Sequence, residues 1–295
     1  MTLTSPAASP RPTCISTQAK IHRAGRLSVA ANPGADARLT VVPEVPADGP
    51  LPRAGTVMAV TARPGQESAE LGGLLHAFRG QGASLALLCL TRGEASPLNS
   101  TYMPLEAIRP WELQLAASVL GISSVTVTNY PDGRLGRFPL AELTEHVRRA
   151  IRRHTPDLLL VIDPAAGDPD DTAVAAATCA AARQAGVPAV ARTVSAVSGA
   201  WVMDLGAEAA AARAIQRSAA TAHVSQSEAL PQLKRCLDSL DGREHLRWLV
   251  PQDEGPPGKP WLPPKCRALG QQPSRAASTM KPELSGAPPS LIAGA

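Results

Sequence analysis

The sequence predicts an α/β fold in which a Rossmann-like parallel sheet of about five or six strands is flanked by helices. Two observations predict it. Short apolar runs of strand length alternate with longer segments whose apolar residues recur at helical spacing, and glycine or proline stands at most of the junctions. Strands that alternate with helices of this length are typical of parallel, doubly wound sheets.

The first β-α-β unit occupies residues 56–94. Its expected elements are a strand at 56–61, a turn at Pro64 and Gly65, a helix from about Gln66, and a strand at 84–90. Parallel sheets carry their functional loops at the carboxyl ends of the strands. We therefore expect the site in the loops at 62–67 and 91–96.

The alternation continues through the middle of the chain. Glycine closes two of the later helices, at Gly121 and Gly186. The further elements expected are helices at 105–120, 140–153 and 171–185, strands at 125–128, 157–162 and 189–194, and a closing helical region at 207–240.

The two ends of the chain differ from its middle in composition. They are rich in proline, alanine, serine and glycine and show no sustained apolar period. Such segments cannot bury enough apolar surface to offset the entropy of ordering. We expect disordered tails at 1–52 and 251–295 and one folded domain at 53–250.

Composition excludes several classes of partner. The net charge is +4, basic residues are scattered, and aromatic residues are only 3 % of the chain, so we expect no nucleic-acid partner. The densest basic cluster, at 148–154, lies on one predicted helix and is expected to be a solvated face. No apolar run reaches the roughly 18 residues of a membrane helix. Five dispersed cysteines fit a reducing cytoplasm.

Several short motifs stand in order along the predicted domain. They are Arg63-Pro64-Gly65-Gln66-Glu67-Ser68, Gly72-Gly73, Thr91-Arg92-Gly93-Glu94, Arg109-x-x-Glu112, Tyr130-Pro131-Asp132-Gly133-Arg134-Leu135 and Ala222-His223-x-Ser225-Gln226. This frame resembles the LmbE-like/PIG-L family of zinc-dependent N-acetylglucosaminyl deacetylases over about residues 56–250. The resemblance implies the LmbE-like deacetylase fold and a site that faces an amino sugar.

The chemical positions of that frame are changed. In the family the first strand ends in Pro-His-Pro-Asp-Asp-Glu-Ser, where the His and the second Asp bind zinc and the first Asp is the general base. Those positions here hold Arg63, Gln66 and Gly65. A later family motif, Gly-His-Pro-Asp-His, supplies an oxyanion-stabilising His and the third zinc ligand. Asp168 and Asp171 stand at these two positions.

These replacements predict that the zinc chemistry is lost. An arginine guanidinium stays protonated and has no lone pair to give a metal. Glutamine is a poor ligand, and one aspartate will not hold the ion. We therefore expect no metal cofactor and no catalytic residue. Arg63 is expected either to pair with Asp171 across the former metal site or to point to solvent.

The acidic loop after the fourth strand allows two interpretations. Asp163, Asp168, Asp170 and Asp171 are dense enough to suggest a site for Mg²⁺ or Ca²⁺, although the spacing is not that of an EF-hand. A helix N-terminus also attracts carboxylates, so Asp170 or Asp171 is expected to cap the next helix. Capping is the favoured interpretation.

Three functions remain open. Glu94, Arg109 and Asp132 survive at positions where the family contacts its amino sugar, so the first is a pseudoenzyme with a small-molecule pocket. The second is an active N-acetyl-sugar deacetylase with a rearranged or non-zinc site. The third is a scaffold or interaction protein whose partner the sequence does not identify.

Overall fold

The computed structural model of the chain describes residues 26–27, 41–42, 47–193, 197, 199–239 and 242–250. The predicted tails at 1–52 and 251–295 lie almost wholly outside these residues. Within the first, β1 (Arg26–Leu27) pairs antiparallel with β2 (Val41–Val42). β3 (Ala47–Asp48) belongs to the main sheet and Leu51 is buried, so the folded region begins before the predicted boundary at 53.

The core of the main sheet is parallel. Its four neighbouring pairs β6–β5, β5–β4, β4–β7 and β7–β8 all run in the same direction. The order reverses beside β4, the first of the five parallel strands along the chain, as in a doubly wound fold. The parallel strands are β4 (Thr56–Thr61), β5 (Ser84–Thr91), β6 (Ser124–Tyr130), β7 (Leu158–Ile162) and β8 (Ala189–Thr193). All five predicted strands are present.

The sheet extends beyond the prediction on one side. β10 (Arg243–Val250) runs antiparallel between β8 and β9 (Ala200–Asp204), and β3 pairs with β9, which completes eight strands. The sheet is therefore mixed rather than parallel throughout. The sequence 243–250 intersperses charged residues with apolar ones, and only pairing to β8 and β9 identifies it as a strand.

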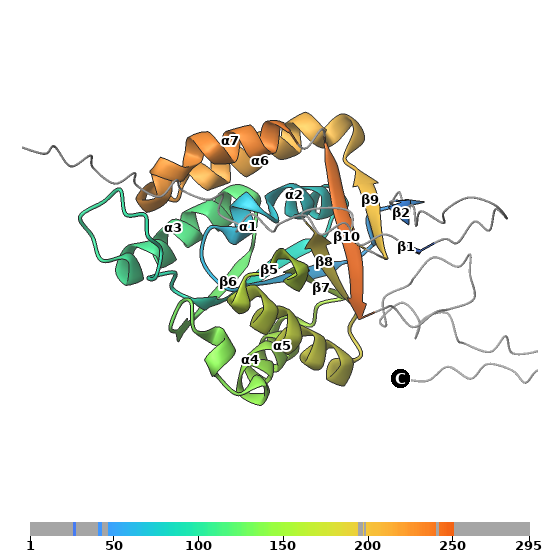
Figure 1. Ribbon diagram of the computed structural model, residues 1–295, viewed down its shortest axis with the longest axis horizontal. Helices are drawn as coiled ribbons and strands as arrows, with labels where there is room; N and C mark the ends of the chain where they lie inside the picture. The colour runs from blue at the N-terminus through green and yellow to red at the C-terminus, as the bar shows by residue number, and fades with distance from the viewer. Residues whose placement is uncertain are drawn as a thin grey trace, which may run out of the picture. The chain divides into compact units, whose positions relative to one another are not determined.

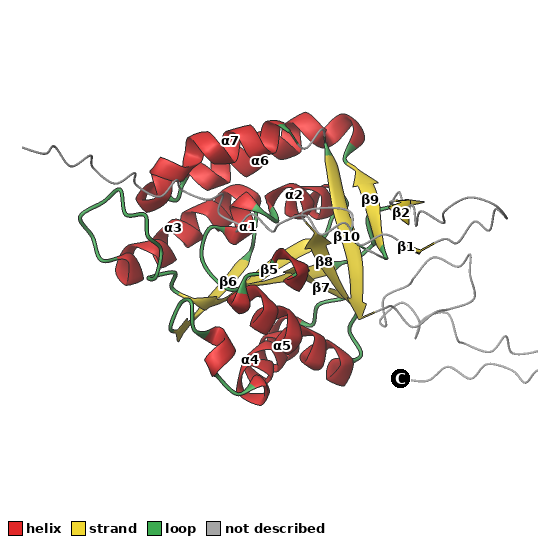
Figure 2. Cartoon of the chain, in the orientation of Figure 1, coloured by secondary structure: helices red, strands yellow, loops and turns green. Residues whose placement is uncertain are grey.

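Helices cover both faces of the sheet (Figures 1 and 2). The helices are α1 (Gln66–Ala69), α2 (Gly72–Gly80), α3 (Leu105–Leu120), α4 (Leu140–His154), α5 (Pro169–Ala185), α6 (Ala209–Thr221) and α7 (Leu230–Asp238). Figure 1 shows α4 and α5 on one side and the other helices on the opposite side. Along β4, Val57 and Ala59 enter one core and Met58 and Val60 the other, as a strand buried on both faces requires.

The helix expected from Gln66 is divided in two. α1 ends at Ala69 with Glu70 as its C-cap, and α2 begins at Gly72 directly against Gln216 of α6. A Cβ at Gly73 would lie 2.6 Å from Nη1 of Arg213 and 2.9 Å from Oε1 of Glu244. Because Gly72 and Gly73 have no side chains, they leave room for a group of buried polar residues. We call this group the Glu244 cluster: Glu70, Arg192, Arg213, Gln216 and Glu244.

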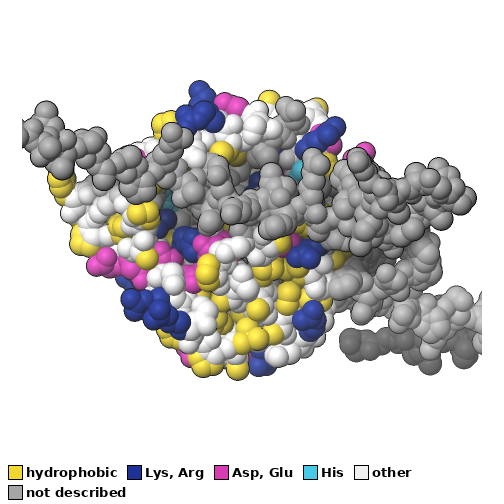
Figure 3. Space-filling view, in the orientation of Figure 1, with side chains coloured by type: hydrophobic (Ala, Val, Ile, Leu, Met, Phe, Trp, Pro, Cys, Tyr) yellow, Lys and Arg dark blue, Asp and Glu magenta, His cyan; other side chains and the backbone are white. Residues whose placement is uncertain are grey.

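The surface carries no single basic patch on the face drawn in Figure 3, where Lys and Arg side chains lie in separate groups. The Arg side chains of α4 surround Glu145 on an exposed helix face, as expected. Among the described helices, none combines the length and the apolar character needed to cross a bilayer.

Candidate functional site

Arg63 lies immediately after β4, where the strand order reverses. Its Nε donates to Oδ1 of Asp132 at 3.1 Å, and its two terminal nitrogens donate to the carboxylate of Asp168 at 2.9 and 3.1 Å. Nη2 also lies 3.8 Å from Asp170. The side chain is only 20 % exposed, so it does not point to solvent. The prediction that Arg63 pairs with Asp171 is wrong, because the carboxylate that accepts both hydrogen bonds belongs to Asp168.

Asp168 is fixed by the helix that follows it. It is the N-cap of α5 and accepts hydrogen bonds from the backbone N–H groups of Asp170 and Asp171, at 2.8 and 3.3 Å. Capping is thus present, but by Asp168 rather than by the predicted Asp170 or Asp171. Burial alone would raise the pKa of Asp168, yet the hydrogen bonds and charge of Arg63 outweigh it and lower the pKa.

The next two carboxylates hold the surrounding loops. Asp170 accepts from the backbone N–H groups of Gly133 and Leu135, at 2.7 and 2.9 Å, and so ties the loop after β6 to α5. Asp171 accepts from Nε2 of Gln66 at 2.7 Å. Burial, reinforced by the charge of Asp168, raises the pKa of Asp171 to about 6. We call Arg63, Asp132, Asp168, Asp170 and Asp171 the Arg63 cluster.

The turn between β4 and α1 is also satisfied internally. Gln66 is 2 % exposed, and its Oε1 accepts from the backbone N–H groups of Ala62 and Arg63 at 2.9 and 3.2 Å. Gly65 has φ = 100°, a left-handed conformation that suits glycine. No side chain projects from the position at which the family resemblance expects a general base.

A zinc ion does not fit the residues at the three family ligand positions. The guanidinium of Arg63 offers only donors, the oxygen of Gln66 is used by two backbone N–H groups, and Asp171 is bonded to Gln66. The hard-cation alternative fits no better, because the four aspartates face different donors. Asp163, for example, accepts two hydrogen bonds from Arg247, at 2.7 and 2.8 Å.

The three residues expected to contact a sugar have different roles. Asp132 and Arg109 line a cavity, whereas Glu94 does not. Glu94 accepts from the backbone N–H of Asp132 at 2.8 Å and so supports the loop. Arg109 donates to the backbone carbonyls of Gly93 and Pro64 and joins the loops after β5 and β4. Burial lowers the pKa of Arg109.

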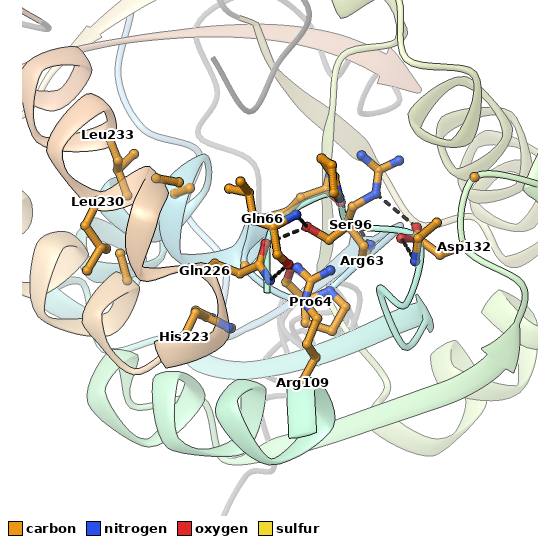
Figure 4. A pocket seen from close by; sticks show the side chains of 18 residues that line it. Arg63, Pro64, Gln66, Ser96, Arg109, Asp132, His223, Gln226, Leu230 and Leu233 are labelled. Atoms are coloured by element: carbon orange, nitrogen blue, oxygen red, sulfur yellow. Dashed lines mark hydrogen bonds and ion pairs between the residues drawn. The ribbon is translucent and has the colours of Figure 1, made fainter. Parts of the chain in front are cut away.

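The cavity lies beside the Arg63 cluster and has a volume of about 360 Å³. The loops after β4, β5 and β6 form one end of it, and the segment from α6 to α7 forms the other (Figure 4). Its size is at the lower end of the range of roughly 300–1,000 Å³ that is common for small-molecule sites. Its lining includes Arg63, Gln66, Ser96, Arg109, Asp132, His223, Gln226, Leu230 and Leu233.

The sequence did not predict a buried pair at this cavity. Glu67 is fully buried, and its Oε1 lies 2.7 Å from Nε2 of His223, which lines the cavity. Burial would raise the pKa of Glu67, but the charge and hydrogen bond of His223 lower it below its ordinary value. Nδ1 of His223 is buried without a partner among the described residues. The motif at 222–226 located His223; only the tertiary structure joins it to Glu67.

The segment that carries His223 is anchored from two sides. Glu112 on α3 accepts from the backbone N–H and the hydroxyl of Ser225, at 2.6 and 2.7 Å. Ser96 donates to Oε1 of Gln226 at 2.6 Å. These bonds hold the loop after β5 against the turn after α6, and so define the cavity wall.

Comparison with known proteins agrees with this fold. Residues 58–182 match the family model described as PIG-L, GlcNAc-PI de-N-acetylase. Over 113 residues the chain is 30 % identical to a probable N-acetyl-α-D-glucosaminyl L-malate deacetylase 2 of Bacillus anthracis. The matched part covers 37 % of this chain and about half the length of that relative.

Solved structures share the architecture at low identity. A diacetylchitobiose deacetylase from Pyrococcus horikoshii matches with a TM-score of 0.55 and 16 % identity, over 67 % of this chain and 84 % of that one. A 4-carboxy-2-hydroxymuconate hydratase from Pseudomonas putida matches with a TM-score of 0.53 and 16 % identity, over 68 % and 98 %. The resemblance seen in the sequence and the α/β fold are confirmed. The hydratase shows that the fold also serves other reactions.

Proposed function

We propose that this chain, whose residues 58–182 form a PIG-L-family domain, is a metal-free protein that binds a small amino-sugar-like molecule without hydrolysing it. The single observation that carries the proposal is the guanidinium of Arg63, held by Asp132 and Asp168 at the position where the family resemblance places a zinc-binding histidine. A permanently protonated group cannot ligate zinc, and its charge repels a cation.

The loss of the base supports the same conclusion. Zinc-dependent hydrolysis needs a metal-bound water with a pKa of about 7 and a group to take its proton. Gly65 provides no such group. The cavity itself is retained, with Arg109 and Asp132 in its wall. The protein can therefore still bind an amino-sugar-like molecule that it does not hydrolyse.

The test is direct. Protein purified with zinc present and then dialysed is analysed for divalent metals, titrated with glucosamine and N-acetylglucosamine, and assayed for release of acetate. We expect no retained metal, measurable binding and no acetate. Stoichiometric zinc, or acetate release above the rate in buffer, would overturn the proposal.

A restored variant gives the matched control. Arg63→His, Gly65→Asp, Gln66→Asp, Asp168→His and Asp171→His together replace the changed family positions. If these positions alone account for the loss, the variant gains zinc binding and acetate release. A folded variant that binds zinc and stays inactive would show that the cavity wall also differs.

A second function is supported by the pair formed by Glu67 and His223. A buried carboxylate that holds one nitrogen of a histidine sets the tautomer and orientation of the ring, as general bases require. Such a pair beside a cavity suits metal-free proton transfer. Turnover that survives chelation and is abolished by His223→Gln would favour this enzyme over the binding protein.

A further inference from the structure

The cavity has two chemically different ends (Figure 4). Arg63 and Asp132 lie at one end, and Leu230 and Leu233 of α7 lie at the other. The two leucines are three residues apart, so they share one face of the helix. Leu237, on the same stripe, is buried, whereas Leu230 and Leu233 remain half-buried against the cavity.

Further apolar side chains line the cavity besides the two leucines. The cavity lining also includes Ala220 of α6, Ala229, which directly precedes Leu230 in the chain, and Leu98 from the loop after β5. A chain of carbon atoms that entered this space would remove the exposed faces of Leu230 and Leu233 from water. Burial of apolar surface is favourable in proportion to its area.

The polar end, in contrast, has few free hydrogen-bonding atoms. Arg63 makes three hydrogen bonds to carboxylates, and Asp132 accepts from Arg63, from Thr91 and from the backbone N–H of Ala95. The amide of Gln226 bonds Ser96, Ser225 and the carbonyl of Leu98. A bare sugar would find few partners, so the apolar end must supply much of the affinity.

We infer that the occupant of this cavity is a small amphiphile, with a polar group of amino-sugar size at the Arg63 end and a short acyl or alkyl chain against Leu230 and Leu233. This inference rests on the proposed binding function and names its ligand class. The volume of about 360 Å³ suits a single small head group and a short chain. A membrane lipid would exceed it.

The test is a titration of the full chain with glucosamines that carry N-acetyl, N-butanoyl, N-hexanoyl and N-octanoyl chains, all below their micelle concentrations. The affinity is expected to rise by up to about fourfold per methylene group, as burial of about 0.8 kcal/mol each implies, and then to level off when the cavity is full. A flat series would overturn the inference and leave the binding function intact. No binding by any member would overturn the binding function as well.

Variants of the cavity wall test where the acyl chain of the ligand binds. Leu233→Gln should lower the gain in affinity for each added methylene group, because one of the two leucines that cover the acyl chain is then polar. Leu115→Gln is the matched control, because Leu115 is 61 % exposed on α3 and does not line the cavity. If Leu233→Gln does not fold, Ala229→Met is the second test. Its larger side chain takes up space next to Leu230, so the acyl length that gives the highest affinity should become shorter. An unchanged optimum in Ala229→Met would contradict the inference.

Discussion

The two polar clusters of this protein differ in composition and in exposure. The Glu244 cluster joins two arginines to two glutamates beneath α2, where Glu244 accepts from Arg213 at 2.5 Å and from Arg192 at 3.3 Å. The Arg63 cluster places one arginine among four aspartates beside a cavity. The first cluster pairs its arginines with carboxyl groups inside the fold, whereas the second leaves carboxylates in excess at the wall of a cavity.

The largest effect should come from Glu244→Ala. It leaves two buried guanidinium groups without their shared carboxylate, so the free energy of unfolding should fall by about 3–5 kcal/mol. Urea unfolding measures this. The control is Glu145→Ala on the exposed face of α4, which should change nothing measurable although Glu145 also contacts arginines. Equal effects would remove the distinction between buried and exposed clusters.

Arg63→Met should have the next largest effect. It removes the only cation of the Arg63 cluster and should cost about 2–3 kcal/mol at pH 7, less than a fully buried pair because Arg63 is one-fifth exposed. Arg63 lowers the pKa of Asp168. The stabilisation is therefore present above the unfolded pKa of Asp168, near 3.8, and is lost as the pH falls through the lower folded value. The difference in unfolding free energy between the two proteins should stay constant from pH 7 to about pH 4 and shrink below it; a difference that does not shrink on further acidification would contradict the pairing.

Gly73→Ala tests how closely the Glu244 cluster packs against α2. The added methyl would meet Arg213 and Glu244 within 3 Å, so we expect a loss of about 1–2 kcal/mol. Gly80→Ala is the control on the same helix. Gly80 has no atom within 4 Å of the added methyl, so that variant should be unchanged or slightly more stable. Thermal unfolding of both variants distinguishes packing from helix propensity.

The smallest effect concerns pH. Burial raises the pKa of Glu70 from 4.5 to about 7, although Arg192 opposes the change. The folded protein therefore holds a proton that the unfolded chain has released, and the corresponding stability is complete below pH 4.5 and lost as pH rises towards 7. Glu70→Gln should make stability fall less steeply with pH, and the slope that remains should come from the other carboxyl groups whose pKa values burial raises, Asp170 and Asp171. An unchanged slope would mean that Glu70 is charged in the fold.

Local pattern predicted much of the fold because each element carries its own signal. The strand at 56–61 and the helix at 105–120 have the predicted bounds. β10 was not predicted, since its partners β8 and β9 are distant in the sequence and supply the pairing that makes it a strand. The division of α1 from α2 likewise depends on Arg213 and Glu244, which approach from other elements.

The sequence by itself determined which chemical groups stand at the site: a guanidinium, an amide and a carboxylate at the three family ligand positions, because the motifs are contiguous. Only the tertiary structure decided how they pair. Asp168 lies at a helix N-terminus that fixes its carboxylate opposite Arg63, so it outcompetes Asp171. The pair of Glu67 with His223 and the apolar wall of α7 join segments far apart in the chain, and such contacts exist only once the core has packed.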